Sequence, residues 1–414
     1  MKIKWLSYKW ELVILLWLAF FFHQADRQIF NVVLPAIRAD LGLTDAEMGL
    51  VAGILTLVYG ILVPIAGFLS DKSNKKIIII ISLFCWSVAT LFTGLSTLLI
   101  YLIILRGVAT GAGEAFYSPA ANALIGEYHE KTRSTAMSIH QTALYAGIVV
   151  SGYLAGWIAD IFGWRTAFYL FGGFGILLGI LLIFRLKNSR LPIPASSQAS
   201  GIPVMHALKM FFSKPTVLLI TLAFAGMVFV NVGFMTWMPT YLHERFGFSL
   251  ARSGFDATFY HYLAAFFGVM LGAWVSDHYS DKISGIRGWV QALGLMLGAP
   301  FILLIGQGGT PFILYVGLTL FGLFRGVYDS NIFATLYDII EPKFRASATG
   351  LMLMFAFVAG ASSPYILGLL KPRLGLSWGL SSLAVVYVLS SLCIIIALKW
   401  FYKKDMIKGI ATPT

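Results

Sequence analysis

The chain has 414 residues, of which 58% are hydrophobic and only 12% are charged. Soluble globular domains are roughly 45–50% apolar and about 25% charged, so this composition excludes an ordinary soluble protein. The excess lies in continuous apolar runs of about 20 residues, the length that a helix needs to cross a hydrocarbon core about 30 Å thick. Because backbone polar groups in lipid must be satisfied internally, and because these runs do not alternate, they predict membrane-spanning helices.

The net charge is +12, which in a soluble protein would suggest a nucleic-acid partner. We predict twelve membrane spans, at residues 11–36, 47–70, 77–97, 98–126, 134–160, 165–186, 215–242, 250–275, 286–307, 311–338, 345–370 and 376–402. With a cytoplasmic N-terminus, 21 of the 30 Lys and Arg residues lie on the cytoplasmic side, six lie outside and three lie within spans. This bias follows the positive-inside rule and places both termini in the cytoplasm. The sequence thus predicts a multi-pass protein of a bacterial inner membrane, surrounded by the lipid bilayer and binding no nucleic acid.

The sequence shows none of the patterns of an enzyme or a metal site. The two cysteines, Cys85 and Cys393, lie inside predicted spans, with neither a disulfide framework nor metal-ligand spacing. We find no nucleophile arrangement, metal cluster or phosphate loop, and no extramembrane segment large enough to hold one. We therefore predict no enzymatic activity, no metal and no cofactor.

A polar segment rich in Pro and Ser, residues 187–206, follows the sixth predicted span. Its place between six spans and six spans is typical of a linker between two helical bundles, with an ordinary long loop as the alternative. The predicted organisation is an N-terminal bundle, a cytoplasmic linker, a C-terminal bundle and a cytoplasmic tail, at residues 1–186, 187–214, 215–402 and 403–414.

Two short motifs occur twice, once in each half of the chain. GFLSDKSNKK (67–76) follows the second span, and AWVSDHYSDK (273–282) follows the eighth. RSTAMS (133–138) opens the fifth span, and RASATG (345–350) opens the eleventh. A duplicated pair at similar offsets indicates an internal repeat. The predicted fold class is therefore an all-α membrane protein with two pseudo-symmetric six-helix bundles.

Six strongly ionisable residues lie well inside the predicted spans. A charge at the bilayer centre costs about 2.5–3.5 kcal/mol on insertion scales, so such residues are rare unless they are functional. All six lie on the first, fourth or tenth span, and they comprise three cations and three anions: Asp26, Arg27, Arg106, Glu114, Arg325 and Asp329. We expect them to face a polar interior.

The carboxylates of this set are candidates for carrying a proton. Glu114 lies in GAGEAFYSPAANAL (111–124), where glycines allow helices to approach closely and Pro119 disturbs the helix. A buried carboxyl group that can be protonated suits a reversible proton carrier. The alternative is a set of buried ion pairs that only fix helix packing. The other candidates for proton coupling are Asp26, Arg106 and Asp329.

The arginines are candidates for binding an anion. Arg325 and Asp329 are four residues apart and therefore share one helix face. A guanidinium offers a planar fork that matches a carboxylate, so an anionic substrate could compete with Asp329 for Arg325. The alternative is a permanent ion pair that only braces the tenth span. Arg27 is the second candidate cation.

Further polar residues within the spans are weaker candidates for contacting a bound molecule, because a lone polar residue in a span usually bonds a neighbouring helix. These candidates are His140, Gln141, Tyr145, Asn231, Trp237, His261, Tyr328 and Asn331.

The chain resembles the major facilitator superfamily over essentially its whole length, because the motif at 67–76 is similar to that family's loop motif between the second and third spans. The resemblance implies that Asp71 pairs with a helix end and with a basic residue, for which Arg345 is the candidate, and holds the cytoplasmic side shut. The second copy departs from the motif, with Ala273 in place of a glycine. The resemblance also implies that the first, fourth, seventh and tenth spans line a central cavity. The gate candidates are Asp71, Arg133, Asp277 and Arg345.

Within that family, three stretches resemble the spinster-like branch: ADRQIFNVVLP (25–35), RGVATGAGEAFYSP (106–119) and AGASSPYILG (359–368). This resemblance implies proton-linked transport, with a polar switch made of Asp26, Arg27, Arg106 and Glu114. Two features depart from the branch. The interval from Arg106 to Glu114 is one residue longer, and Arg325 stands where a carboxylate is expected. An arginine there argues against a lysolipid or sphingolipid cargo and favours an anion.

GEAFYSP (113–119) and GWRTAF (163–168) also resemble bacterial symporters for acidic sugars such as hexuronates and sialic acid. We therefore predict a monomeric transporter that carries a small organic anion, an acidic sugar, together with a proton by alternating access. Sodium is the alternative coupling ion. The alternative functions are a spinster-like lipid exporter, a drug:proton antiporter and, outside transport, a receptor built on a transporter fold.

Overall fold

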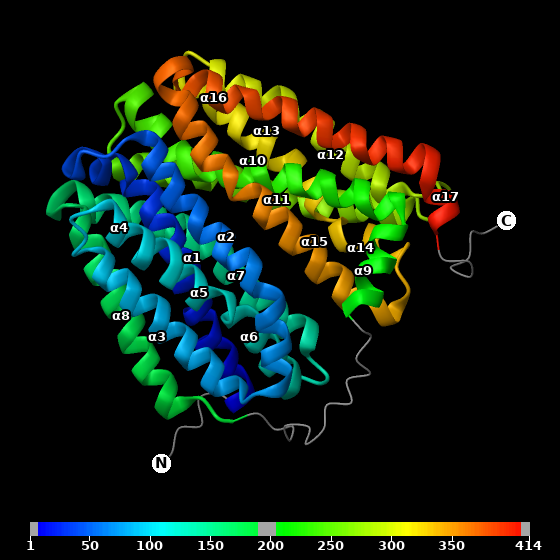
Figure 1. Ribbon diagram of the computed structural model, residues 1–414, viewed down its shortest axis with the longest axis horizontal. Coiled ribbons are helices and arrows are strands. Elements are labelled where there is room, and N and C mark those ends of the chain that lie inside the picture. Colours follow the sequence, from blue (N-terminus) through cyan, green and yellow to red (C-terminus); the bar gives the residue numbers. More distant parts are fainter. Residues whose placement is uncertain (1–6, 189–203, 407–414) are drawn as a thin grey trace. The chain divides into compact units, whose positions relative to one another are not determined.

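The structure is a computed structural model that describes residues 7–188 and 204–406 (Figure 1). Within these two ranges the regular secondary structure is helical and no strand occurs. The predicted all-α fold class is therefore confirmed. Most of the polar segment at 187–206, and the end of the predicted tail at 403–414, lie outside the described residues.

Contacts within the chain divide it into two units. The first unit comprises Met1–Ser197 and Met238–Phe255, and the second comprises Gln198–Trp237 and Asp256–Thr414. The division is not a single cut in the sequence, because the hairpin that joins the seventh and eighth predicted spans groups with the first unit.

Helices of the first unit pack along one another, with α1 against α7 and α3 against α8 (Figure 1). The fourth predicted span is not one regular helix, since it consists of three α-helical pieces and a π-helix between the first two. The helices of this unit are α1 (Tyr8–Leu41), α2 (Asp45–Lys72), α3 (Lys75–Thr93), α4 (Leu99–Leu102), the π-helix (Ile103–Ala109), α5 (Thr110–Ala115), α6 (Tyr117–Tyr128), α7 (Arg133–Phe162) and α8 (Trp164–Arg185).

In the second unit, α12 packs against both α13 and α16. The helix α10 begins in this unit and ends in the first, and α11 begins in the first unit and continues in the second. The helices are α9 (Val204–Ser213), α10 (Pro215–Phe246), α11 (Leu250–His278), α12 (Ile286–Gln307), α13 (Pro311–Asp329), α14 (Ile332–Tyr337), a 3-10 helix (Pro342–Phe344), α15 (Arg345–Gly360), α16 (Ser362–Ile396), a second π-helix (Ala397–Phe401) and α17 (Tyr402–Asp405).

The number of helices long enough to span a bilayer agrees with the sequence prediction. In the described ranges, ten helical stretches are long and apolar enough to cross a membrane. The last of them, Ser347–Asp405, has 59 residues and contains Gly375 at a φ of 73°, a left-handed conformation that breaks the helix and leaves room for two passes. The 34-residue α1 is not among the ten but is long enough for one more. The helices are thus consistent with twelve spans.

Large apolar side chains lie exposed along these helices. Phe184 is 79% exposed, Phe312 is 75% exposed and Trp400 is 67% exposed. Apolar surface of this extent is unfavourable in water and marks a surface that another apolar phase covers. The surface therefore fits a multi-pass membrane protein.

Within the first unit, α7 lies against the beginning of α11 so closely that no side chain fits between the backbones. A Cβ added at Gly156 would lie 2.4 Å from backbone atoms of Leu250. One turn further along α7, the Asp160 carboxylate accepts hydrogen bonds from the backbone N–H groups of Leu250 at 3.1 Å and Ala251 at 3.0 Å. These donors belong to the first turn of α11, which has no acceptors within its own helix. Asp160 therefore caps α11 from a different helix.

Ion pairs at the same end of the first unit join the loop ends of further helices. Arg38, near the end of α1, pairs with Asp45 at 2.5 Å and with Glu244 of α10 at 3.1 Å. Asp40 accepts a hydrogen bond from Arg165 at the start of α8, and this bond holds the pKa of Asp40 below its ordinary value. The contacts fix the helix ends of the unit to one another outside the predicted spans.

Candidate functional site

The six ionisable residues predicted inside the spans form two buried clusters, one in each unit. The first cluster lies on α1, α3 and the pieces of the fourth span, and the second lies on α10, α11 and α13. Each cluster contains an arginine paired with a carboxylate, Arg27 with Glu114 and Arg325 with Asp329. The clusters differ in how closely these charges are paired.

In the first cluster, Arg27 of α1 and Glu114 of α5 form a close ion pair. The Arg27 Nε lies 2.6 Å from Glu114 Oε2, and the Glu114 side chain is completely buried while that of Arg27 is 28% exposed. The Arg27 guanidinium also lies over the Tyr59 ring, 4.2 Å from its centroid. A charged hydrogen bond of this length in a buried site is strong. Losing either partner would leave the other charge uncompensated.

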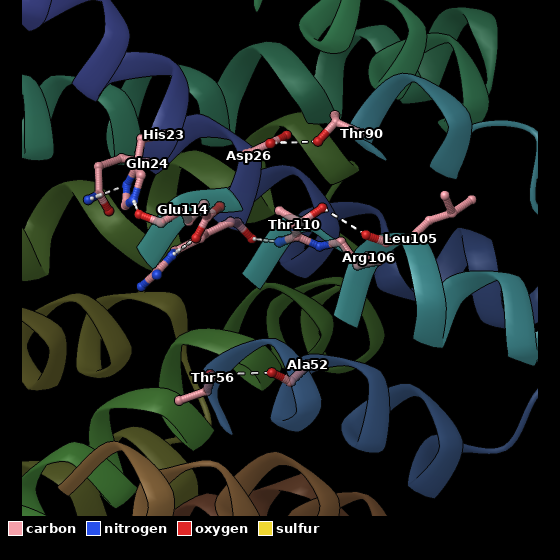
Figure 2. A network of polar contacts seen from close by, with 11 residues as sticks. His23, Gln24, Asp26, Ala52, Thr56, Thr90, Leu105, Arg106, Thr110 and Glu114 are labelled. Carbon is pink, nitrogen blue, oxygen red and sulfur yellow. Dashed lines mark hydrogen bonds and ion pairs between the residues drawn. The ribbon is translucent and has the colours of Figure 1, made fainter. Parts of the chain in front are cut away.

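The neighbouring residue on α1, Asp26, is turned toward a different helix. Its Oδ2 accepts a hydrogen bond of 2.5 Å from the Thr90 hydroxyl on α3 (Figure 2). Adjacent residues on a helix point about 100° apart, which explains why Asp26 and Arg27 reach different partners. Asp26 also interacts electrostatically with Arg106 of the fourth span.

Arg106 is buried with most of its hydrogen-bonding capacity unused. One terminal nitrogen donates to the Arg27 carbonyl at 3.2 Å, while Nε and the other terminal nitrogen have no hydrogen-bond partner within the described residues. Figure 2 shows Arg106 and Glu114 on the same span, with Thr110 between them. Arg106 bonds the main-chain carbonyl of Arg27, and Glu114 bonds the Arg27 side chain.

The π-helix at Ile103–Ala109 explains how Arg106 and Glu114 come to share one face. At about 100° per residue, eight residues of regular α-helix would place the two side chains about 80° apart. A π-helical turn takes in one extra residue, so the eight residues act as seven, which corresponds to about 20°. The Thr110 hydroxyl donates to the Leu105 carbonyl five residues earlier, at 3.0 Å, inside this widened turn. The additional residue noted between Arg106 and Glu114 is therefore absorbed without rotating the cluster apart.

The helix is interrupted again just beyond Glu114. α5 ends at Ala115 and α6 begins at Tyr117. Pro119 has no N–H group to bond the carbonyl four residues before it, which is that of Ala115. The predicted effect of Pro119 thus coincides with the observed break, which directly follows the carboxylate.

A neutral histidine lies beside this ion pair. His23 Nε2 lies 3.3 Å from the Glu114 carbonyl and must donate to it, while its Nδ1 accepts from Gln24 Nε2 at 3.2 Å. Both ring nitrogens are therefore used by a single neutral tautomer. His23 packs the cluster without adding a charge.

In the second cluster, Arg325 of α13 is held mainly by neutral groups. Its Nη1 donates to Asn231 Oδ1 at 2.5 Å and lies 3.1 Å from His261 Nε2. The carboxylate of Asp329, one turn away on the same helix, lies 3.4 Å from Arg325 Nε, longer than an ordinary charged hydrogen bond. Asp329 Oδ1 has no hydrogen-bond partner in the described part of the chain. The predicted Arg325–Asp329 pair is thus present, but loose.

The weaker candidates fall into two groups. Asn231 and His261 contact Arg325, as described above. The others lie elsewhere: His140 stacks on Phe20 and bonds Tyr117; Trp237 donates to the Pro364 carbonyl; Asn331 donates to Ser276 and Ser330; Tyr328 is buried; Tyr145 is partly buried; and Gln141 is exposed. Their roles in binding stay predictions.

The gate candidates are described in part. Arg345 donates to the carbonyls of Tyr337 at 3.0 Å and Ile340 at 3.4 Å. Arg133 is exposed and lies over Gly126, and Asp277 is exposed at the end of α11. The side chain of Asp71 lies outside what the structure describes, so its pairing stays a prediction. Within residues 7–188 and 204–406, no group of three or more His, Cys, Asp or Glu side chains is placed to hold a metal ion.

Sequence reasoning missed the partners that complete each cluster. Thr90 and Tyr59 in the first cluster and Tyr262 in the second, which interacts with Arg325, were not singled out. Hydroxyl residues are frequent in apolar spans, so no sequence signal distinguished these three. The π-helix did have a signal, the one-residue excess between Arg106 and Glu114.

The sequence profile of the Major Facilitator Superfamily matches residues 16–364. The chain belongs to this superfamily of membrane transporters. The predicted resemblance is confirmed, and the chain is a multi-pass membrane transporter rather than an enzyme.

Relatives of both kinds that the sequence resembles are found. A hexuronate transporter of Bacillus subtilis (strain 168) is 25% identical over 381 residues, which cover 89% of this chain and 89% of that protein. Protein spinster homolog 1 of Xenopus laevis is 24% identical over 400 residues, covering 89% of this chain and 74% of that protein. A bacterial homologue of the human lysosomal transporter spinster, solved in an inward-facing and unoccupied conformation, has a TM-score of 0.85 at 21% identity, with 97% of this chain and 99% of that chain covered. The structural likeness supports the fold alone.

Proposed function

We propose that this transporter carries a small organic anion, an acidic sugar of the hexuronate type, together with a proton across a bacterial inner membrane. Its two termini would lie in the cytoplasm, as the positive-inside distribution of Lys and Arg indicates. The sequence similarity to a hexuronate transporter is compatible with this substrate class.

The observation that carries the proposal is the presence of a partly buried arginine, paired with a carboxylate, in each cluster. Arg27 and Arg325 are permanent cations on apolar spanning helices, and an ionisable residue in such a place is by default a candidate functional residue. A guanidinium matches a carboxylate better than it matches an uncharged sugar. An anion is therefore the ligand class that this charge distribution favours.

Glu114 supports proton coupling because its carboxylate is completely buried and bonds Arg27 directly. A proton on Glu114 would weaken that bond and free Arg27, so the proton and the anion could bind in a linked manner. In this account Asp26, Arg106 and Asp329 assist by stabilising the charges of the two clusters.

A spinster-like export of lysolipid is the second candidate, favoured by the similarity to spinster homolog 1. Uptake into proteoliposomes separates the two. We expect radiolabelled D-glucuronate to accumulate under an inwardly directed proton gradient. An equal sodium gradient should not drive this accumulation, and labelled lysophosphatidylcholine should not be transported. Accumulation driven by a sodium gradient alone would show that sodium is the coupling ion. Transport of labelled lysolipid without transport of glucuronate would show that the substrate is a lysolipid.

A further inference from the structure

The second cluster contains a histidine whose protonation state is fixed by its neighbours. An arginine side chain has hydrogen-bond donors and no acceptor. His261 Nε2, at 3.1 Å from Arg325 Nη1, must therefore accept the hydrogen bond, which requires a neutral ring with its proton on Nδ1. The tautomer follows from chemistry and does not depend on an assigned hydrogen.

The other ring nitrogen of His261, Nδ1, carries a proton that is not used in a hydrogen bond within the described residues. The residue is completely buried, yet its Nδ1 has no hydrogen-bond partner among the described residues. Buried polar atoms are nearly always paired, so an orphaned donor calls for a function. In contrast, His23 in the first cluster uses both of its nitrogens. A purely structural histidine would be satisfied in the same way.

Two phenylalanine rings pack against His261. Its ring lies 4.8 Å from the Phe321 ring and 6.0 Å from the Phe234 ring, measured between centroids. The titratable and charged groups facing this His261–Arg325 pair from the packed helices are Tyr262 of α11, Arg325 and Asp329 of α13 and Tyr387 of α16. Arg325 is the cation in contact with His261, and Asp329 is the single carboxylate of this group.

We propose that His261 is a second proton-binding site, which takes up a proton when an anion binds to Arg325. Without an anion, a protonated His261 would direct an N–H group at a guanidinium and place two cations in contact, so the neutral form is favoured. A bound carboxylate replaces His261 as the acceptor for Arg325 and adds the negative charge that compensates an imidazolium. The anion and the proton therefore favour each other's binding.

This inference deepens the proposed function and rests on it. It assigns a proton to the second cluster, in addition to the one that Glu114 would carry in the first. The anion class is the same, a carboxylate-bearing sugar. The consequence is that binding of the anion alone, without any transport, draws protons from solution.

Calorimetric titration of the purified full-length protein with D-glucuronate tests this directly. Measuring the binding heat at one pH, in buffers of low and high ionisation enthalpy, gives the number of protons taken up per bound anion. We expect wild type to take up protons and His261→Gln to take up about one fewer, because an amide oxygen can accept from Arg325 but cannot titrate. His278→Gln is the matched control, since this residue lies exposed at the end of the same helix, and its proton uptake should equal that of wild type.

The second measurement uses the Glu114→Gln variant, because this substitution leaves the second cluster unchanged. This variant should still take up protons on binding glucuronate, because His261 is intact. If Glu114→Gln takes up none, or if folded His261→Gln takes up as many as wild type, His261 is not a proton site. If wild type binds no glucuronate at all, the proposed substrate class fails, and the inference fails with it.

Discussion

The two partly buried arginines that pair with carboxylates, Arg27 and Arg325, are held in different ways. Arg27 lies 2.6 Å from a carboxylate that is itself completely buried, whereas Arg325 lies 3.4 Å from its carboxylate and closer to neutral acceptors, Asn231 at 2.5 Å and His261 at 3.1 Å. Separating a buried charge pair has a large free-energy cost, whereas an arginine can exchange neutral acceptors for a carboxylate at little free-energy cost. We therefore assign the proton of Glu114 to the first cluster, and anion recognition, with the further proton proposed for His261, to the second.

The largest expected effect follows from the tighter pair. Glu114→Gln should abolish accumulation driven by a pH gradient, because the amide cannot exchange a proton, while exchange of glucuronate across the membrane should remain measurable. Uphill uptake and exchange in proteoliposomes measure the two processes separately. Undiminished uphill uptake by the variant would contradict the role of Glu114 and turn attention to Asp26.

The second effect concerns recognition. Arg325→Ala should weaken D-glucuronate binding by roughly ten- to a hundredfold, which corresponds to the loss of about 1.5–3 kcal/mol for a charge-assisted contact. Arg325→Lys should rescue binding poorly, because a compact ammonium cannot reproduce the planar fork. Equilibrium binding of labelled glucuronate measures both variants. Normal binding by Arg325→Ala would refute the assignment of the second cluster.

The π-helix predicts a contrast between a deletion and an insertion. Deleting Val108 shortens the interval from Arg106 to Glu114 from eight residues to seven, which a regular α-helix places on one face, so uptake should fall only a few-fold. Inserting one alanine after Val108 makes the interval nine residues, which act as eight with the π-helical turn in place; the two side chains then lie about 80° apart, and coupled uptake should be abolished. Loss of transport in the deletion variant would show that the π-helix does more than maintain the register.

The smallest expected effect is on stability. Asp160→Ala removes the carboxylate that caps the first turn of α11, and loss of such a cap costs about 0.5–2 kcal/mol. The melting temperature in detergent should therefore fall by a few degrees, while Glu130→Ala, which alters an exposed carboxylate, should leave it unchanged. Equal melting temperatures for both variants would mean that the cap contributes nothing measurable.

The sequence predicted the helical membrane fold and the position of the buried charges, because both depend on composition and span length. The insertion penalty singled out Asp26, Arg27, Glu114 and Arg325 without any knowledge of their neighbours. The pairing was not predictable in the same way. Whether Arg27 bonds Glu114 or Asp26 depends on helix rotation, and the register of Arg106 depends on a π-helical turn that adds one residue.

The weaker candidates show the limit of reading single polar residues. His140 and Asn331 resemble His261 and Asn231 in sequence context, yet the first pair joins neighbouring helices and the second pair holds Arg325. What separates them is the neighbour across the helix interface, which no periodicity in one sequence encodes. The Thr90, Tyr59 and Tyr262 side chains were missed for the same reason.

The central claim is that this transporter recognises the negative charge of its substrate. The most direct test is competition by D-glucuronate and D-glucuronamide against labelled glucuronate uptake, in wild-type proteoliposomes under a fixed pH gradient. The two compounds differ only at the carboxyl group, which is ionised in the acid and neutral in the amide. The account predicts that the amide competes at least about tenfold more weakly than the acid. Equal competition by the neutral amide would contradict it.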